Sequence, residues 1–384
     1  PVFAQSESPE IVVTARKLAE LRAGLEDCIS RKCPPLEDIA ASVAYAEEQF
    51  MGGDYRQARN TLHDAIGRNR EFAGEYPVAV SGLYRASSRT AEHLGLPGRM
   101  MDDLRNMHKI VVRHAPENHA QRVTMEIELA DGMTKLGGVT TASHMYEDAE
   151  NLARTHGDGR LAALARLRRI ALMLNYPSDK YDASYTEQQL RVFRLGRMAK
   201  ARKMLDEMLA DPMPGAEDQM LVADMLGRRI DLALDRAEDE DMETYYRDME
   251  QIAKTLPPSS RPILLTHTVM AAHEGETQQP AGDRLHGGRE AWADAEYRIA
   301  MDGTVTDIEI IASGGSEDWP DLVAKSLMNR RYLPPVYEDQ FSPGNIRVER
   351  FSRTYDMEDS ARAGTRIRVR TSQATVRALD ITPG

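Results

Sequence analysis

Hydrophobic residues recur every three or four positions along most of the chain before residue 257, a spacing that predicts amphipathic helices. Glycine and proline residues interrupt the pattern and divide it into pairs of helices separated by short turns. The predicted helices span residues 36–51, 56–69, 76–94, 99–114, 117–136, 139–156, 160–174, 186–209, 219–236 and 242–256. An earlier helix is expected to begin at Thr14 or just after it, and Gly196 predicts a turn inside the helix at 186–209.

In the last quarter of the chain the hydrophobic period becomes that of a strand. Alternate positions are apolar or small at Ala295, Tyr297, Ile299 and Met301, as in a half-buried strand. Asp302-Gly303 predicts a tight turn into a second strand, in which Ile308 and Ile310 face inward.

A helix and further strands follow this hairpin. Ser316 or Asp318 is a suitable cap for a helix with Pro320 in its first turn. The apolar face of this helix comprises Leu322, Val323, Ser326 and Leu327. Pro334-Pro335 ends the element, and residues 345–355 predict a third strand.

The resulting β-β-α-β module resembles the C-terminal domain of the TonB family. The similarity rests on the Asp302-Gly303 hairpin, the single helix, the Arg-Tyr-Leu-Pro-Pro run at 331–335 and the strand at 346–351. The chain departs from the family after Tyr355, where it continues with a segment that contains Arg366, Arg368 and Arg370. The resemblance implies a periplasmic domain that binds a partner by strand addition at an edge comprising Ile346, Val348, Arg350 and Phe351. In the alternative arrangement the added strand at 366–370 already occupies this edge. The alternative is a small α+β sandwich of no particular family.

The N-terminal segment predicts an extended leader, because Pro9 is followed by β-branched residues. It resembles the TonB box of TonB-dependent outer-membrane transporters. That resemblance assigns partner binding to Glu10, Ile11, Val12, Val13, Thr14 and Ala15. It also implies that residues 11–13 pair with a TonB-like edge, in this chain or another. The alternative is a disordered leader.

Residues 46–58 resemble a tetratricopeptide repeat, with Gly53, Tyr55 and Ala58 at its turn and small packing positions. Later units match that family poorly, so we expect a degenerate solenoid of helical hairpins. The expected fold is multidomain, with an α-helical hairpin repeat followed by a small α+β domain. The expected divisions are an export-signal remnant and leader at residues 1–13, the repeat at 14–272, a linker at 273–288 and the TonB-like domain at 289–384.

Cys28 and Cys33 are the only two cysteines. Pro34 favours extended geometry at Cys33, which lets the chain turn back and close a disulfide in an oxidising compartment. In the cytosol the pair would be two thiols. Val2-Phe3-Ala4 has small residues at the spacing that a signal peptidase reads, which agrees with the periplasm. An uncleaved anchor helix is the alternative.

Composition and motif content argue against several classes of function. The net charge of −12 argues against general nucleic-acid binding, and no apolar run approaches the roughly 20 residues of a membrane span. The common hydrolase, nucleotide-binding and zinc-protease motifs are missing, and His108, His114 and His119 do not share a helical face. We therefore expect no catalytic residues, no cofactor and no metal site.

The arginines at 366, 368 and 370 alternate with Ile367 and Val369, so they form one face of a strand. This row would either bind an anionic lipid headgroup or neutralise the acidic helical region, and we favour the second. The sequence as a whole predicts a periplasmic binding or adaptor protein that engages a protein partner, such as a TonB-dependent transporter or a TonB-like domain. The alternatives are an energy transducer of the TonB class and a purely structural scaffold.

Overall fold

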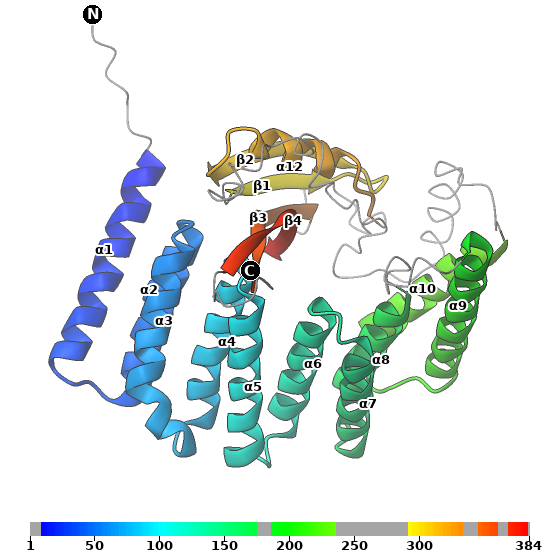
Figure 1. Cartoon of the computed structure of the whole chain (residues 1–384), viewed down its shortest axis with the longest axis horizontal. Helices are drawn as coiled ribbons and strands as arrows, with labels where there is room; N and C mark the ends of the chain where they lie inside the picture. Colours follow the sequence, from blue (N-terminus) through cyan, green and yellow to red (C-terminus); the bar gives the residue numbers. More distant parts are fainter. Residues whose placement is uncertain (1–8, 175–185, 236–290, 333–344, 360–367, 383–384) are drawn as a thin grey trace, which may run out of the picture. The chain divides into compact units, whose positions relative to one another are not determined.

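The computed structural model describes residues 9–174, 186–235, 291–332, 345–359 and 368–382. Within these ranges a helical region is followed by a small four-stranded sheet with one helix, which agrees with the predicted fold class at this coarse level (Figure 1). The chain divides into two compact units. One comprises residues 1–125, 278–288 and 354–375, and the other residues 126–277, 289–353 and 376–384.

The first unit contains five long helices and one short 3-10 helix. These are α1 (Pro9–Ser30), α2 (Pro35–Met51), α3 (Tyr55–Asn69), η1 (Arg70–Gly74), α4 (Pro77–His93) and α5 (Pro97–His114). Four of them begin with proline, whose fixed φ suits the first turn and whose missing N–H costs no helical hydrogen bond. Gly53 and Gly95 adopt positive φ in the turns that follow α2 and α4, where a side chain would be strained.

Successive helices of this unit pack against one another, α1 on α2, α2 on α3, α3 on α4 and α4 on α5, and α2 also contacts α4 (Figure 1). Small residues lie at the contacts, which lets the helix axes approach closely. The core comprises Ile39, Ala46, Ala58, Leu62, Ala65, Ile66, Ala73, Val80 and Leu83. The contact between alternate helices, α2 and α4, is the one expected when helical hairpins stack side by side.

The prediction of an extended leader is wrong, because α1 begins at Pro9 and residues 10–15 are helical. Pro9 suits the first turn of a helix. A β-branched residue costs only a few tenths of a kcal/mol relative to a good helix former. Extending a helix that already exists downstream avoids the cost of a new nucleus, so three such residues in succession do not stop it.

Five helices follow, four in the second unit and one at its border. They are α6 (His119–Lys135), α7 (Val139–Thr155), α8 (Gly159–Leu174), α9 (Glu187–Ala210) and α10 (Glu217–Asp235). Helix α6 contains the border between the two units. Helix α8 packs on α7, α9 and α10, and α9 packs on α10. A Cβ atom at Gly159 would lie 2.3 Å from the Pro214 carbonyl oxygen, so only glycine allows this close approach of α8 to the loop before α10.

The predicted turn at Gly196 is wrong, since α9 runs through this residue without a break. One glycine costs about 1 kcal/mol in a helix interior, too little to interrupt a helix that continues on both sides. The predicted helix at 242–256 and the predicted linker at 273–288 lie outside the described residues. Among the residues that the structure describes, no helix is both long and apolar enough to cross a lipid bilayer.

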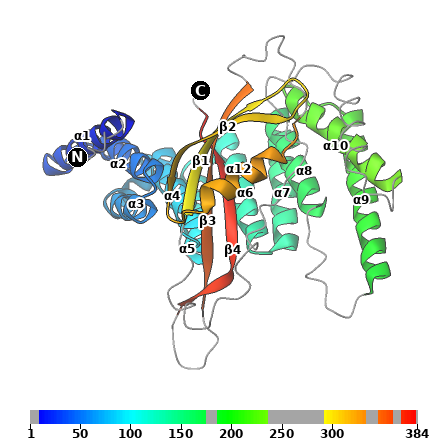
Figure 2. The same cartoon turned by 90° about the horizontal axis from the view of Figure 1, so that it is seen from above.

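The sheet contains β1 (Ala291–Ile299), β2 (Val305–Gly314), β3 (Ile346–Asp359) and β4 (Arg368–Asp380), and α12 (Trp319–Met328) follows β2. The strand order is β2-β1-β3-β4, and β1 is antiparallel to both of its neighbours (Figure 2). The predicted turn at Asp302-Gly303 is confirmed. Gly303 has a φ of 81°, and one carboxylate oxygen of Asp302 accepts hydrogen bonds from the Thr304 backbone N–H and hydroxyl, at 2.9 and 2.6 Å.

Helix α12 packs against β1 and β2, and the core lies between them. Alternate residues of β1 face this helix, and three of them are alanines that leave room for it. The buried cluster comprises Ala291, Ala293, Ala295, Tyr297, Ile299, Val305, Trp319, Val323, Leu327, Tyr332 and Phe351. Ile308 and Ile310 pack against this cluster as predicted. Met301 does not continue the strand, because β1 ends at Ile299 and Met301 is 43% exposed in the turn.

In the sequence, Ile346 and Val348 share one strand face and Phe351 falls on the other, which predicts a β-bulge near Glu349–Arg350, but the described ladder has none there. Pairing of β1 with β3 is continuous from Ala291 opposite Arg353 to Arg298 opposite Ile346. Phe351 lies opposite Ala293 and faces α12, while Val348 takes the other face by simple alternation. Both faces of β3 bury apolar side chains, so simple alternation accounts for Val348 and Phe351 without an extra residue.

Candidate protein-binding interface

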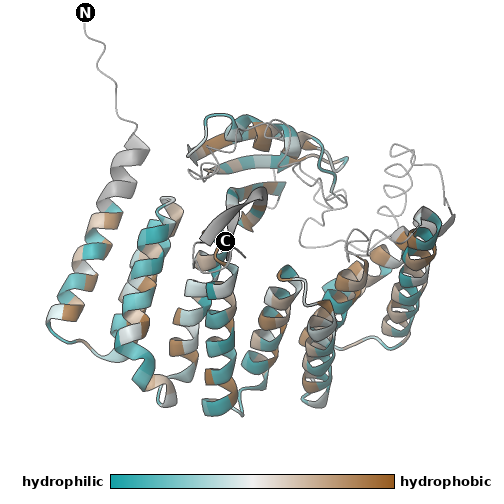
Figure 3. Ribbon diagram, viewed as in Figure 1, coloured by the Kyte–Doolittle hydropathy of each residue, from teal (hydrophilic) through white to brown (hydrophobic). Residues whose placement is uncertain are grey.

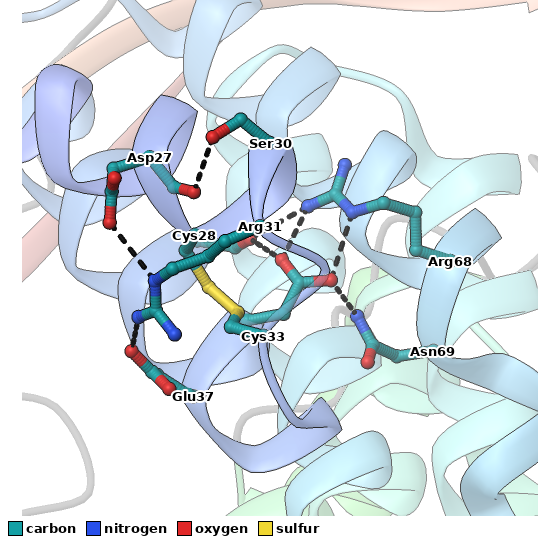
Figure 4. Close-up of a disulfide and its surroundings, with 10 residues drawn as sticks. Asp27, Cys28, Ser30, Arg31, Cys33, Glu37, Arg68 and Asn69 are labelled. Carbon is teal, nitrogen blue, oxygen red and sulfur yellow. Dashed lines mark hydrogen bonds and ion pairs between the residues drawn. A yellow bond between two sulfur atoms is a disulfide. The ribbon is translucent and has the colours of Figure 1, made fainter.

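The disulfide is the most local of the predicted sites. Cys28 in α1 is bonded to Cys33 in the turn before α2, with the two Cα atoms 5.0 Å apart (Figure 4). Lys32 has a φ of 53°, and the Cys33 backbone N–H donates to the Cys28 carbonyl at 3.0 Å, so the chain turns back as expected. The predicted pairing is confirmed, and it fixes the angle between the first two helices at their junction.

The described residues contain one group of side chains with metal-ligand spacing, formed by Cys28, Cys33 and Glu37. Its two sulfurs are bonded to each other, so neither is a thiolate ligand. The Glu37 carboxylate forms an ion pair with Arg31, which also donates to Asp27 (Figure 4). This group is therefore a stapled, ion-paired turn and has the chemistry of a structural element.

A buried carboxylate next to the disulfide joins α2 to α3. Asp38 accepts two hydrogen bonds from Arg68, at 2.9 and 2.7 Å, and others from Asn69 at 2.7 Å and Ser42 at 3.0 Å (Figure 4). Burial alone would raise the pKa of Asp38, but these donors outweigh it and hold the pKa below its ordinary value. The cluster leaves its carboxylate no capacity for a further ligand and serves to hold the helices together.

The proposed strand-binding edge on β3 is already occupied within the chain. The Val348 N–H donates to the Thr382 hydroxyl at 3.0 Å, and the Val348 carbonyl accepts from the Ile381 N–H at 2.9 Å. Arg347 forms an ion pair with Asp380 at 3.0 Å. The edge expected at residues 345–355 is not free, because the segment after Tyr355 returns as β4 and pairs with β3, the alternative in which the added strand fills that edge.

The four side chains of β3 that were predicted to bind a partner are instead ion-paired, buried or half-buried within the fold. Arg350 is fully buried and makes a bidentate ion pair with Asp294, at 2.6 and 2.7 Å, while its guanidinium lies 4.3 Å from the Trp292 ring centroid. Val348 is 8% and Phe351 1% exposed, and Ile346 is half-buried. Sequence reasoning missed the Asp294–Arg350 pair, since its signal is opposite charge at directly opposed positions, which is visible only once the register is known.

For the other residues predicted to bind a partner, the structure gives positions in the fold, and their binding role remains a prediction. Residues 10–15 belong to a helix in the first unit and form no strand of the sheet. Arg368 and Arg370 lie in β4, whereas Arg366 falls outside the described residues. The arginine row as a binding surface is not tested by these positions.

Strand β2 is an edge of the sheet, because β1 is its one neighbour in the strand order. The turn just before β2 is covered by the chain that leaves α12, where Thr304 bridges to Arg331 and the Tyr332 N–H donates to the Gly303 carbonyl at 2.8 Å. Beyond that point, from Thr306 to Ser313, no described segment forms a ladder with the outer side of β2. Ile311 on this strand is 45% exposed.

A buried polar cluster anchors residues 330–332, the segment that lies beside the turn before β2. The Tyr297 and Tyr332 hydroxyl oxygens lie 2.6 Å apart, and Tyr297 donates to Glu349 at 2.9 Å. Arg330 donates to the same carboxylate at 2.8 Å. Burial first, and then the Glu349 charge, raises the pKa of Tyr297, so the phenol stays protonated and continues to donate. The cluster holds this segment beside the turn, and beyond the turn the outer side of β2 has no described partner.

The described part of the sheet has two edge strands, β2 and β4, and no described segment forms a ladder with the outer side of β2 from Thr306 to Ser313. The ion-paired clusters have partners on other elements of the same fold. An open edge can accept an extended peptide through main-chain hydrogen bonds. A comparison of the sequence with models of known protein families and with curated proteins finds no match.

Proposed function

We propose that this chain is a non-catalytic periplasmic binding or adaptor protein that takes an extended segment of a protein partner onto the outer edge of β2. The single observation that carries the proposal is that no described segment pairs with the outer side of β2 from Thr306 to Ser313. The resemblance of residues 289–355 to a TonB C-terminal domain supports the same mode of binding. The tetratricopeptide-like helices supply a second surface for the same partner.

Strand addition at β2 has a defined chemistry. Backbone hydrogen bonds supply affinity for any extended chain, and side chains on alternate positions select the sequence. Glu309 and Ile311 are both exposed, and the β1–β2 pairing shifts register at Ile311, which has no partner in β1. A partner segment with a basic residue near Glu309 and an apolar one near Ile311 would match these two side chains best.

The Cys28–Cys33 disulfide supports the proposed compartment, because such bonds persist in oxidising environments and are uncommon in the cytosol. Binding of a transporter box at β3, as in an energy transducer, would require β4 to leave the sheet. We therefore place the proposed interaction at β2.

The test is selection of binding peptides from a displayed library of short random sequences, followed by hydrogen exchange of the complex. We expect a selected peptide to slow exchange of amides in residues 306–313. Ile311→Pro, which cannot lengthen a ladder, should weaken binding, whereas Met328→Pro at the exposed end of α12 should not. Protection confined to β3 or to the helices would contradict the assignment, as would equal binding by the Ile311→Pro variant.

A further inference from the structure

A cross-strand pair of tryptophan and glycine lies where β2 ends. Trp292 of β1 is directly opposite Gly314, the last residue of β2. A Cβ atom at Gly314 would lie 2.6 Å from the indole Nε1 atom and 3.0 Å from Cε2, and the first of these distances is too short for a Cβ atom. The N–H edge of the indole therefore reaches from the inner strand to Gly314 on the edge strand, and glycine leaves the room that it needs.

The indole is held in this position by the buried ion pair between β1 and β3. The Arg350 guanidinium carbon lies 4.3 Å from the ring centroid of Trp292, and Asp294 accepts two hydrogen bonds from that guanidinium, at 2.6 and 2.7 Å. Arg350 is fully buried, so it cannot turn away without the loss of its counter-charge. Trp292 is half-buried, so part of its ring remains accessible. A ring that is fixed before a partner arrives costs less entropy to engage.

The end of β2 carries small residues on the face of the sheet that Trp292 occupies. This face is directed away from α12, because the alanines of β1 face the helix and Trp292 alternates with them. Gly314 and Ala312 lie opposite Trp292 and Asp294, and neither has a side chain larger than a methyl group. Figure 3 shows both hydrophobic and hydrophilic residues along β1 and β2. Next to the edge, the indole is therefore the one large side chain at this end of the β1–β2 pair on this face.

We infer that Trp292 selects an aromatic residue in the partner segment, at the position opposite Gly314. The inference rests on the proposed strand addition at β2 and names one residue of the segment that binds there. Residues directly opposite each other in neighbouring strands share a face of the sheet. The partner side chain opposite Gly314 therefore lies beside the indole edge and fills the space that glycine leaves.

Edge-to-face geometry favours an aromatic side chain over an aliphatic one. The edge of an aromatic ring carries partial positive charge and its face partial negative charge, so an indole N–H edge attracts the face of a second ring. The Trp319 N–H donates to the Phe351 carbonyl at 3.0 Å, whereas the Trp292 N–H has no such acceptor among the described residues. An aromatic pair strengthens binding by about threefold to tenfold beyond the effect of the area that it buries.

A purely structural role for the pair makes a different prediction. In that role the indole shields the backbone at Gly314 and stabilises the end of β2, as aromatic residues do beside glycines of edge strands. The residue that a bound segment places opposite Gly314 would then have no effect on its affinity. The two roles are distinguished by the peptide sequence and by the environment of the Trp292 N–H.

The test uses the full chain and peptides selected from a library of short random sequences, each with a copy in which its aromatic residue is leucine. We expect phenylalanine, tyrosine or tryptophan to be enriched at one peptide position. The chain has two tryptophans, so nitrogen labelling for NMR gives two indole N–H signals, which a Trp292→Phe variant assigns. The aromatic peptide should move the Trp292 signal upfield through its ring current, and the leucine copy should not. The signal of buried Trp319 is the internal control.

Affinity gives an independent readout. Trp292→Leu should weaken binding of the aromatic peptide by about threefold to tenfold and that of the leucine copy far less, because both substitutions remove the same contact. Trp292→Phe keeps a ring beside Arg350 and should lose less, and circular dichroism shows that each variant is folded.

The outcomes separate this inference from the proposed function. Protection of amides in residues 306–313 with an unmoved Trp292 signal, or equal losses for the two peptides, overturns the role of Trp292 and leaves strand addition at β2 intact. Failure of every selected peptide to protect residues 306–313 overturns both.

Discussion

Arg350 and Asp38 show how this chain accommodates charge away from water. Each is held by a partner on a neighbouring element, Arg350 by Asp294 across two strands and Asp38 by Arg68 across two helices. A buried pair of this kind contributes little over an apolar pair of equal volume, but removal of one member leaves an uncompensated charge. These residues therefore specify how elements meet.

We expect Asp294→Ala to destabilise the sheet domain by about 3–5 kcal/mol, because Arg350 is fully buried and would lose its counter-charge. Denaturant unfolding followed by tryptophan fluorescence measures the change. Asp307→Asn keeps a residue that tolerates the positive φ of this position. It removes the exposed negative charge that pairs with Arg298 and should cost at most about 1 kcal/mol. Equal effects of the two substitutions would show that the buried pair has no special role.

Acid should weaken the first unit through Asp38. Its pKa in the folded chain is below the ordinary value of 3.8, so ionised Asp38 stabilises the fold above that value, and the stabilisation is lost as the pH falls through the lower, folded pKa. Thermal unfolding measured at several pH values below 4 should therefore show a steeper decline for the native chain than for Asp38→Asn. Parallel declines would mean that other carboxylates dominate.

At the scale of elements, most of the fold follows from local signals. The predicted bounds of the helices from residue 36 to residue 235 agree with the structure to within two residues, because proline and glycine mark their ends. The Asp302-Gly303 turn and the inward positions of β2 also follow from sequence. These features depend on neighbours a few residues away, which the sequence displays directly.

Elements that depend on distant partners were not predictable in the same way. The β-branched run after Pro9 has a weak local preference, and the continuation of α1 overrides it. Nothing in residues 346–351 states that β4 will pair with them, and the pairing of Asp294 with Arg350 needs the register of two strands that are far apart in the chain. For this reason the sequence places the candidate edge at β3, whereas in the described structure β3 is paired on both sides and β2 lies at an edge.

The Cys28–Cys33 bond should stabilise the junction of α1 and α2 by about 2 kcal/mol, since it closes a short loop in the unfolded chain. We expect a reductant to lower the unfolding temperature of the native chain and to have no effect on a Cys28→Ala, Cys33→Ala variant. Mass spectrometry of alkylated, unreduced protein from the periplasm checks the bond itself. Two alkylated thiols there would contradict both the bond and the compartment.

At the scale of the whole molecule, the sequence predicts that the helical repeat and the TonB-like domain fold separately, joined near residues 275–288. Limited proteolysis should then cut first in this segment and release two stable fragments, because exposed linkers are preferred sites of cleavage. Fragments whose ends lie inside the helices, with the segment intact, would place the boundary elsewhere.

The position of β4 beside β3 has a kinetic consequence. Because β4 belongs to the same chain, its effective concentration at the β3 backbone remains in about the millimolar range, and a competing peptide must exceed that before it gains access. The rate of any exchange at β3 should level off at high peptide concentration, where the departure of β4 becomes the slow step. At β2, where none of the described segments would have to leave residues 306–313, the rate should keep rising in proportion to the peptide concentration.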